Sequence, residues 1–244
     1  MNKVVMITGA ATGIGKETAT LFAKNGFDVA GTYFKSLTQA QELNESLKGQ
    51  GHKTQFYSLD IRNEADCVNV TERIIKDFGK IDVLINNAGV SQSKLFTEIT
   101  KADLDDMMTT NFSGAFFVTR TVVKDMLKRQ NGKIINISSI WGKHGGSMEV
   151  HYSASKAALD GLTKALAKEL GTSGITVNSV NCGLINTRMN EELSENDKKA
   201  FTSTLPLQRI GNASEVASTV LWLASDDCSY LTGQLISIDG GFSI

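Results

Sequence analysis

Short apolar segments rich in β-branched residues alternate along the chain with longer segments of helical periodicity. The apolar segments are 4–7, 27–32, 54–58, 81–86, 133–138, 175–180 and 234–238. The helical segments are 14–25, 37–48, 64–78, 101–129, 152–170 and 213–224. This alternation predicts βαβ units and a parallel sheet. Because the strand segments are almost continuously apolar, we expect helices to cover both faces of that sheet.

Seven strands of this kind predict an α/β protein with a single doubly wound Rossmann domain over residues 1–244. In such a sheet a nucleotide binds at the carboxyl ends of the strands. The polar segment 187–212 fits no strand and is only weakly helical, so we interpret it as a mobile substrate loop.

Composition and charge exclude several classes of protein. Hydrophobic residues make up 41% of the chain, the formal net charge is −1 and the pI is near 6.3. These values give no basic surface for nucleic acid or an anionic membrane. No apolar stretch approaches the roughly 20 residues of a membrane span, and the N-terminal apolar run is too short for a secretory signal. We therefore expect a cytoplasmic protein.

The cysteines and histidines predict neither disulfides nor a metal site. Cys67, Cys182 and Cys228 are widely scattered and lack CxxC spacing, which is typical of reduced thiols. The three histidines have no metal-ligand spacing, so we expect no bound metal.

The first apolar segment leads directly into the glycine-rich stretch TGAATGIG at 8–15. Glycines let the backbone approach a pyrophosphate, and the N-terminus of the following helix favours its negative charge. The predicted contacts are Gly9, Thr12, Gly13, Ile14 and Gly15. The alternative interpretation is a glycine-rich turn that binds no ligand.

The second apolar segment indicates which dinucleotide would bind. An NAD site usually has an acid at the end of this strand, where it binds the adenosine ribose. No acid occurs in 29–36, and Asp28 lies at the start of the strand. Lys35 suits a 2′-phosphate, so we predict NADP(H); the alternative is an ordinary solvated lysine. Asp60 is placed either to meet adenine or to cap a helix.

The stretch HYSASK at 151–156 places Tyr152 and Lys156 four residues apart, on one face of a predicted helix. Such a pair is either a surface coincidence or a lysine that lowers the pKa of a phenol for proton transfer. A cation about 4 Å from the phenol supplies about 4 kcal/mol at an effective dielectric constant of about 20. That energy would move the pKa from ~10 to ~7.

Four motifs stand in order along the chain: TGAATGIG at 8–15, NNAG at 86–89, Ser139 ahead of YSASK, and DGG at 239–241. Together they resemble the short-chain dehydrogenases/reductases over essentially all 244 residues. The segment 206–241 is most similar to the 3-oxoacyl-[acyl-carrier-protein] reductase group. The resemblance implies NADPH-dependent reduction of a ketone, most of all a 3-oxoacyl thioester, by a homotetramer.

The resemblance assigns catalytic roles to Asn111, Ser139, Tyr152 and Lys156. Tyr152 would protonate the carbonyl oxygen and contact the cofactor, and Lys156 would favour phenolate and bind the nicotinamide ribose. Ser139 would donate to the carbonyl oxygen. Asn111 would position a water; its alternative is a core polar residue satisfied by backbone groups. The remaining cofactor contacts implied are Tyr33, Ile61, Asn87, Ala88, Gly89, Val90, Gly183, Ile185 and Thr187.

Two stretches depart from the usual family pattern. Cys182 and Gly183 stand where the family has Pro-Gly. Proline fixes its own φ angle near −65°, so cysteine at this position leaves that angle free to vary. Cys182 therefore loosens the loop, lines the substrate pocket as a reactive thiol, or fills a small buried space. Trp141 and the Glu149-Val150 pair resemble a branch that reduces a 5-aminopentanone adduct on elongation factor P.

These departures leave alternatives open. Trp141 would pack under the substrate loop or contact the substrate, and Glu149 would be solvated or face the ligand.

The sequence also leaves alternative functions open. Besides the elongation-factor reductase, they are a broad carbonyl or hydroxysteroid reductase and an NADP-sensing module without catalysis. The ketone would be a free small molecule or bound to acyl carrier protein. Lys128 and Arg129 match the family's basic docking site for that acidic partner, but the second basic position is Ser173.

Overall fold

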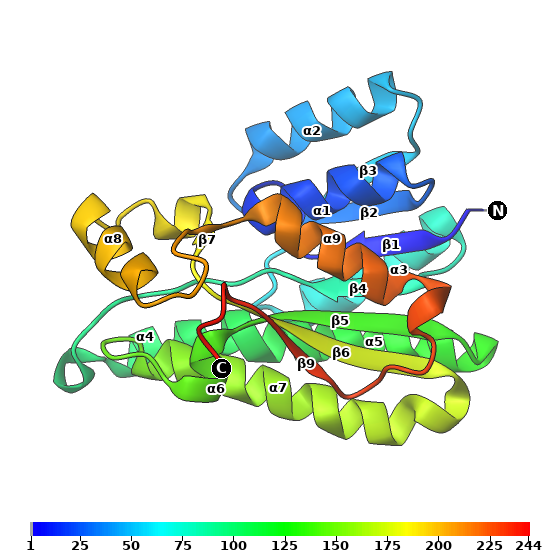
Figure 1. The fold of residues 1–244 in the computed structure, drawn as a ribbon. Coiled ribbons are helices and arrows are strands. Elements are labelled where there is room, and N and C mark those ends of the chain that lie inside the picture. The colour runs from blue at the N-terminus through cyan, green and yellow to red at the C-terminus, as the bar shows by residue number, and fades with distance from the viewer. Residues whose placement is uncertain (1) are drawn as a thin grey trace.

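A seven-stranded parallel sheet forms the centre of the computed structural model, which describes residues 2–244 (Figure 1). The strands are β1 (Val4–Ile7), β2 (Asp28–Tyr33), β3 (Thr54–Ser58), β4 (Val83–Asn86), β5 (Gly132–Ser139), β6 (Ile175–Cys182) and β9 (Leu235–Ile238). Their order in the sheet is β3-β2-β1-β4-β5-β6-β9. All seven predicted strands and the doubly wound topology, with its reversal at β1, are confirmed.

Helices cover both faces of this sheet (Figure 1). On one face lie α1 (Gly13–Lys24), α2 (Leu37–Gly49) and α9 (Ala213–Ala224), and on the other α3 (Glu64–Phe78), α5 (Gly114–Arg129) and α7 (Val150–Leu170). Successive side chains of β1 point to opposite faces, so Val5 packs with Phe22 of α1, and Met6 packs with Ile74 of α3. Within residues 2–244, none of the helices combines the length and apolar character needed to cross a bilayer.

The expected single helix over 101–129 is wrong. The structure has α4 (Lys101–Met108) and α5, joined by a π-helical turn (Thr109–Ser113). Helical periodicity alone does not reveal one extra residue in a turn, because the apolar pattern on either side stays helical.

The segment 187–212 is more regular than its sequence predicts. It contains α8 (Glu195–Ser203), whose N-terminus is capped by Ser194: the hydroxyl accepts from the Asp197 nitrogen at 3.1 Å. It also contains β8 (Gly211–Asn212), which pairs with β7 (Ile185–Asn186). Two-residue strands are too short for any hydrophobic period. A further short helix, α6 (Ile140–His144), follows β5 directly.

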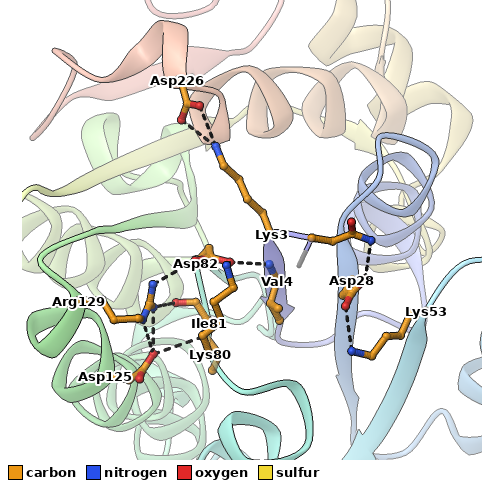
Figure 2. A network of polar contacts seen from close by, with 11 residues as sticks. Lys3, Val4, Asp28, Lys53, Lys80, Ile81, Asp82, Asp125, Arg129 and Asp226 are labelled. Atoms are coloured by element: carbon orange, nitrogen blue, oxygen red, sulfur yellow. Dashed lines mark hydrogen bonds and ion pairs between the residues drawn. The ribbon is translucent and has the colours of Figure 1, made fainter.

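An ionic network fastens the amino ends of the strands (Figure 2). Arg129 of α5 binds Asp82 at 3.0 Å and Asp125 at 2.9 Å, and Asp82 accepts from the Val4 nitrogen at 2.8 Å. Asp28 binds Lys53 at 3.0 Å, so this acid lies at the edge opposite the strand ends that face a nucleotide, as expected.

Candidate active site

The loops after β1 and β4 lie together at the carboxyl edge of the sheet. The Thr8 hydroxyl accepts hydrogen bonds from the backbone nitrogens of Asn87 at 2.9 Å and Ala88 at 3.0 Å. The Asn87 side chain donates to the carbonyl oxygens of Thr8 at 2.9 Å and Gly9 at 3.0 Å. The glycine loop and the NNAG loop, both predicted to bind cofactor, are therefore joined directly.

The glycine loop leaves the N-terminus of α1 open. Gly9 and Gly13 have φ angles of +66° and +54°, which glycine adopts without strain. A Cβ on Gly15 would lie 2.2 Å from the Gly9 carbonyl oxygen, so the loop folds back on itself here. Thr12 makes no side-chain capping bond, and the first turn of α1, which includes Ile14, contains no acid. These helix-terminal N–H groups fit the pyrophosphate of a dinucleotide.

Charged and aromatic side chains gather at the ends of β2 and β3. Asp60 binds Arg62 at 2.8 Å, and Arg62 also binds Asp106 at 3.1 Å. The Arg62 guanidinium lies 5.1 Å from the ring centroid of Phe34. Its hydrogen bond, with a smaller effect of Lys35, lowers the pKa of Asp60. None of the sequence motifs points to Arg62; the signal that could have done so is a cation two residues after Asp60.

At the adenosine end, the structure excludes one of the two interpretations of Asp60 and limits how Ile61 could contact a cofactor. Asp60 does not cap α3, because Asn63 does so by accepting from the Asp66 nitrogen at 3.2 Å. The Ile61 side chain is buried in the core beneath α3 and α5, so only its backbone can meet a ligand. Tyr33, at the end of β2, is half-buried beside this region.

Three of the four predicted catalytic side chains meet beyond the end of β5. The Lys156 amine lies 5.7 Å from the ring centroid of Tyr152 and donates to the Ile137 carbonyl oxygen at 2.9 Å. Ser139 ends β5 and caps α6, where its hydroxyl accepts from the Trp141 nitrogen at 3.2 Å. Tyr152, Lys156 and Ser139 are only 8%, 5% and 6% exposed, so the positive charge of Lys156 acts on the two hydroxyl groups with little screening by water.

Burial dominates the ionisation of the phenol and the amine. It raises the pKa of Tyr152 above its ordinary value, although a side-chain hydrogen bond with Ser139 opposes the rise. It lowers the pKa of Lys156 to about 8. Desolvation of the phenolate therefore opposes the predicted lowering of the phenol's pKa and outweighs the Ser139 hydrogen bond, which acts in the other direction. The phenol stays protonated, which is the form that can donate to a carbonyl oxygen.

Asn111 lies in the π-helical turn and connects the loop after β4 with α7. Its Oδ1 accepts from the Val90 nitrogen at 2.8 Å, and its Nδ2 donates to the Val90 oxygen at 2.9 Å and to the Ser155 hydroxyl at 3.0 Å. The side chain is thus satisfied largely by backbone groups. A Cβ on Gly89 would lie 3.2 Å from Asn111 Oδ1 and 3.5 Å from Lys156 Nζ. Asn111 therefore lies beside Lys156, and its hydrogen bonds hold the loop after β4 against α7.

Cys182 continues β6 and does not loosen the chain. It pairs with Ser139 on one side and with Ile238 of β9 on the other. Its side chain is buried in the core, and burial raises the pKa of the thiol to about 12. These observations favour a small buried filler over a loosened loop or a reactive thiol.

The segment after β6 returns to the glycine loop. A Cβ on Gly13 would lie 3.5 Å from the side chain of Thr187, so Thr187 borders the loop across the site. The Ile185 side chain is buried in the core. A Cβ on Gly183 would lie 2.8 Å from the Asp239 Cα, and only glycine fits this crossing of strand ends.

Trp141 packs against α8, within the segment 187–212. Its ring meets Phe201 of α8 and Phe242 edge-on, with centroid distances of 6.2 Å and 5.5 Å. Phe201 and Phe242 stack at 5.6 Å. These contacts favour the packing interpretation of Trp141, since they tie α6, α8 and the C-terminal segment together. Across the described residues 2–244, no group of three or more His, Cys, Asp or Glu side chains is arranged to hold a metal ion.

Comparisons with known proteins place these features in a family. A family model described as Enoyl-(Acyl carrier protein) reductase matches residues 9–243. The chain is 42% identical to the 3-oxoacyl-[acyl-carrier-protein] reductase FabG of Thermotoga maritima over 243 residues, which are 99% of this chain and 98% of that protein. It is 36% identical to FabG of Escherichia coli over 239 residues, 98% of this chain and 96% of that protein.

Solved structures show the same fold. A blue fluorescent protein from a metagenomic library, in complex with NADPH, is similar with a TM-score of 0.93 and 33% identity, covering 99% of this chain and 98% of that chain. A mutant of a Serratia marcescens short-chain dehydrogenase/reductase is similar with a TM-score of 0.93, 32% identity and the same coverage of 99% and 98%.

The site and the comparisons agree on one class of protein, the nicotinamide-dependent oxidoreductases that act on ketone or alcohol groups. Coverage of almost the whole chain then defines the family within that class. The chain belongs to the short-chain dehydrogenases/reductases.

Proposed function

We propose that the protein reduces a 3-oxoacyl thioester to the 3-hydroxyacyl product. NADPH, when bound, would supply the hydride that reaches the carbonyl carbon. The observation that carries the proposal is the buried cluster of Ser139, Tyr152 and Lys156 beside the open N-terminus of α1. The FabG relatives support the choice of a 3-oxoacyl substrate.

Each side chain of the cluster has a separate task in this reaction. Tyr152 is protonated because burial raises its pKa, and its phenol donates that proton to the carbonyl oxygen. The Ser139 hydroxyl donates a hydrogen bond to the same oxygen and stabilises the negative charge that develops there. Lys156 places a positive charge 5.7 Å from the phenol's ring centroid, where it stabilises the phenolate left behind.

The cofactor would lie along the carboxyl edge of the sheet. Gly9, Gly13 and the first turn of α1 would hold the pyrophosphate, and Thr187 would face the nicotinamide end. Lys35 would bind a 2′-phosphate at the adenosine end. Arg62 is less suited to that task, because Asp60 and Asp106 already neutralise it.

Lys35→Ala is expected to raise the KM for NADPH about tenfold and to leave the KM for NADH unchanged. Within residues 2–244 the Lys35 amine forms no ion pair, and it lies 5.9 Å from the Phe34 ring centroid, so its charge is available for a phosphate. Tenfold corresponds to about 1.4 kcal/mol, a typical loss for one charged contact. Lys48→Ala, an exposed lysine of α2, is the matched control. Equal losses with both dinucleotides would contradict phosphate recognition by Lys35.

Initial rates with a 3-oxoacyl carrier protein, the free thioester and a panel of simple ketones test the proposed substrate. The Arg129 guanidinium is bound to Asp82 and Asp125 at the opposite edge of the sheet (Figure 2). Of the two basic residues predicted to dock acyl carrier protein, only Lys128 therefore keeps a charge that is available to it. We therefore expect a small advantage of carrier-bound over free thioester. No NADPH oxidation with any ketone would favour a sensing module instead.

A second candidate substrate, a ketone that carries a protonated amine, is favoured by Glu149. This half-buried residue is the N-cap of α7, three residues before Tyr152 and hence on the same face. Its carboxylate makes no hydrogen bond or ion pair within residues 2–244, and burial raises its pKa. An unpaired anion here disfavours negative charge on the substrate oxygen, and a substrate cation would offset that cost. The elongation-factor adduct is one such ketone.

Glu149→Gln is expected to lower kcat/KM for 5-(dimethylamino)-2-pentanone about tenfold while leaving that for 6-methyl-2-heptanone unchanged or higher. The two ketones match in length, and only one carries a cation, so their ratio isolates the charge contact. Glu72→Gln, an exposed acid of α3, serves as the control. An unaltered ratio in the Glu149 variant would exclude this carboxylate as a cation site.

A further inference from the structure

Asp160 is a buried carboxylate to which the proposed reaction assigns no task. It lies one helical turn beyond Lys156 on α7 and is 4% exposed. Among residues 2–244, no lysine or arginine forms an ion pair with it. A buried carboxylate without a direct ionic partner is costly unless hydrogen bonds and a nearby cation compensate. The groups around Asp160 therefore indicate which interactions compensate the cost of burying its carboxylate.

Both oxygens of Asp160 accept hydrogen bonds from β6. Oδ1 accepts from the Ser179 hydroxyl at 2.9 Å, and Oδ2 accepts from the Asn181 side chain at 2.7 Å. The same Asn181 nitrogen donates to the carbonyl oxygen of Ser139 at 3.1 Å. A continuous hydrogen-bonded path thus runs from α7 through β6 to the backbone of Ser139 on β5.

The start of α6 closes over the same carboxylate. A Cβ on Gly142 would lie 3.0 Å from Asp160 Oδ2 and 3.0 Å from the Lys156 carbonyl carbon. Only a glycine lets α6 approach α7 this closely. The chain that leaves Ser139 is therefore pressed onto α7 beside Lys156, with Asp160 at the centre of the contact.

Asp160 is also the anion that acts on the Lys156 amine. Burial lowers the pKa of Lys156 to about 8, and interactions with Cys182 and with the negative charge of Asp160 act in the opposite direction. Tyr152 on α7 and Cys182 on β6 also face the amine, and both are uncharged at neutral pH because burial raises their pKa.

The charged groups on the other elements packed against α7 are engaged elsewhere. On α6, Lys143 donates to Ser237 at 2.8 Å and His144 contacts Ser243 at 3.0 Å. On α4, Asp103 binds Lys94 at 2.7 Å. On α7 itself, Glu149 at the N-cap is also unpaired within residues 2–244, but it acts on Tyr152. Asp160, one turn from Lys156, is therefore the carboxylate placed to balance the charge of that amine.

We propose that Asp160 is a positioning residue for the reaction, with two separable effects. Its negative charge keeps Lys156 in the ammonium form, and its bond to Asn181 fixes the backbone that carries Ser139. This inference rests on the proposed ketone reduction, in which the Lys156 charge and the Ser139 hydroxyl act beside Tyr152.

The pH profile of kcat separates the charge of Asp160 from its hydrogen bonds. Activity falls as the pH rises through the pKa of Lys156, because the ammonium form is lost. Asp160→Asn removes the anion that raises this pKa. The descending limb of the profile, where kcat falls with rising pH, is therefore expected about one pH unit lower. Ser179→Ala deletes one hydrogen bond and leaves the charge, so its limb is expected to coincide with that of the unsubstituted protein.

Asn181→Ala tests the second effect. It breaks the link to Ser139 and leaves the Asp160 charge, so kcat is expected to fall about fivefold with the limb unmoved. The exchange variant Asp160→Asn/Asn181→Asp returns a carboxylate to the same pair and is expected to restore the limb toward its original pH. Thermal unfolding and NADPH binding of every variant show whether the fold persists.

The charge effect is also measurable without turnover. NMR titration of the protein labelled with ¹³C-lysine is expected to show the pKa of Lys156 about one unit lower in Asp160→Asn than in Ser179→Ala. Identical titrations in the two variants, or full kcat in Asn181→Ala, would overturn the inference. Absence of ketone reduction by the unsubstituted protein would instead overturn the proposed function, and the lysine titration would still decide the role of Asp160.

Discussion

Tyr152→Phe is expected to lower the rate of ketone reduction about 10³-fold, the range that a positioned general acid contributes. Phenylalanine keeps the ring that packs beneath Lys156 and removes only the hydroxyl that donates the proton. NADPH binding is expected to stay the same, because the glycine loop and α1 are untouched. Initial rates with a reactive ketone and a fluorescence titration with NADPH measure the two quantities separately.

Tyr230→Phe supplies the control for that experiment. Tyr230 is fully exposed in the loop after α9, so loss of its hydroxyl is expected to change neither the rate nor the binding. Turnover of the Tyr152 variant within tenfold of the unsubstituted rate would remove the phenol from the mechanism. Equal losses of rate and of NADPH binding would indicate a damaged site, not a missing proton donor.

Gly15→Ala is expected to weaken NADPH binding at least thirtyfold and to lower the free energy of unfolding by about 1–3 kcal/mol. The added Cβ would lie 2.2 Å from the Gly9 carbonyl oxygen and 2.6 Å from the Asn87 side-chain nitrogen. The first contact is with a backbone atom, so relief requires the glycine loop to move away from the N-terminus of α1, which displaces the N–H groups proposed to bind the pyrophosphate.

Gly161→Ala is the matched control, since the same methyl group is added where, outside the helix's own backbone, no atom of residues 2–244 lies within 4 Å. Gly161 is exposed on α7, so alanine is expected to stabilise the helix by about 0.5–1 kcal/mol. NADPH binding is expected to stay unchanged. Chemical denaturation and a fluorescence titration measure both effects, and undiminished NADPH binding by the Gly15 variant would show that the loop is not the pyrophosphate site.

Local patterns were enough for the strands and for the motifs at their ends. Each apolar segment could be recognised because a strand buried on both faces needs apolar residues in succession. The glycine loop and the Tyr152–Lys156 pair were readable because their meaning lies in short spacings along the chain. The same local reasoning missed the π-helical turn at Asn111, α6 and most of α8, since their sequences carry little hydrophobic period.

Long-range packing decided the features that no spacing could show. Arg62 joins Asp60 to Asp106 of α4, a residue 44 positions away from the arginine, and Asp160 reaches Ser139 only through Asn181 on a third element. The protonation of Tyr152 is the clearest case. Four-residue spacing places the amine near the phenol, but the depth to which both side chains are buried sets the direction of the pKa.

The sequence by itself therefore determined the order of strands along the chain, the glycine-rich loop after the first strand, the spacing of Tyr152 and Lys156, and the family resemblance, because each depends on short motifs along the chain. Only the tertiary structure decided the directions in which the pKa values of Tyr152 and Lys156 shift, the ion pairs of Arg129 at the far edge of the sheet, and the buried hydrogen-bonded path from Asp160 to Ser139. Those properties depend on which groups are excluded from water together, and the folded chain alone establishes that.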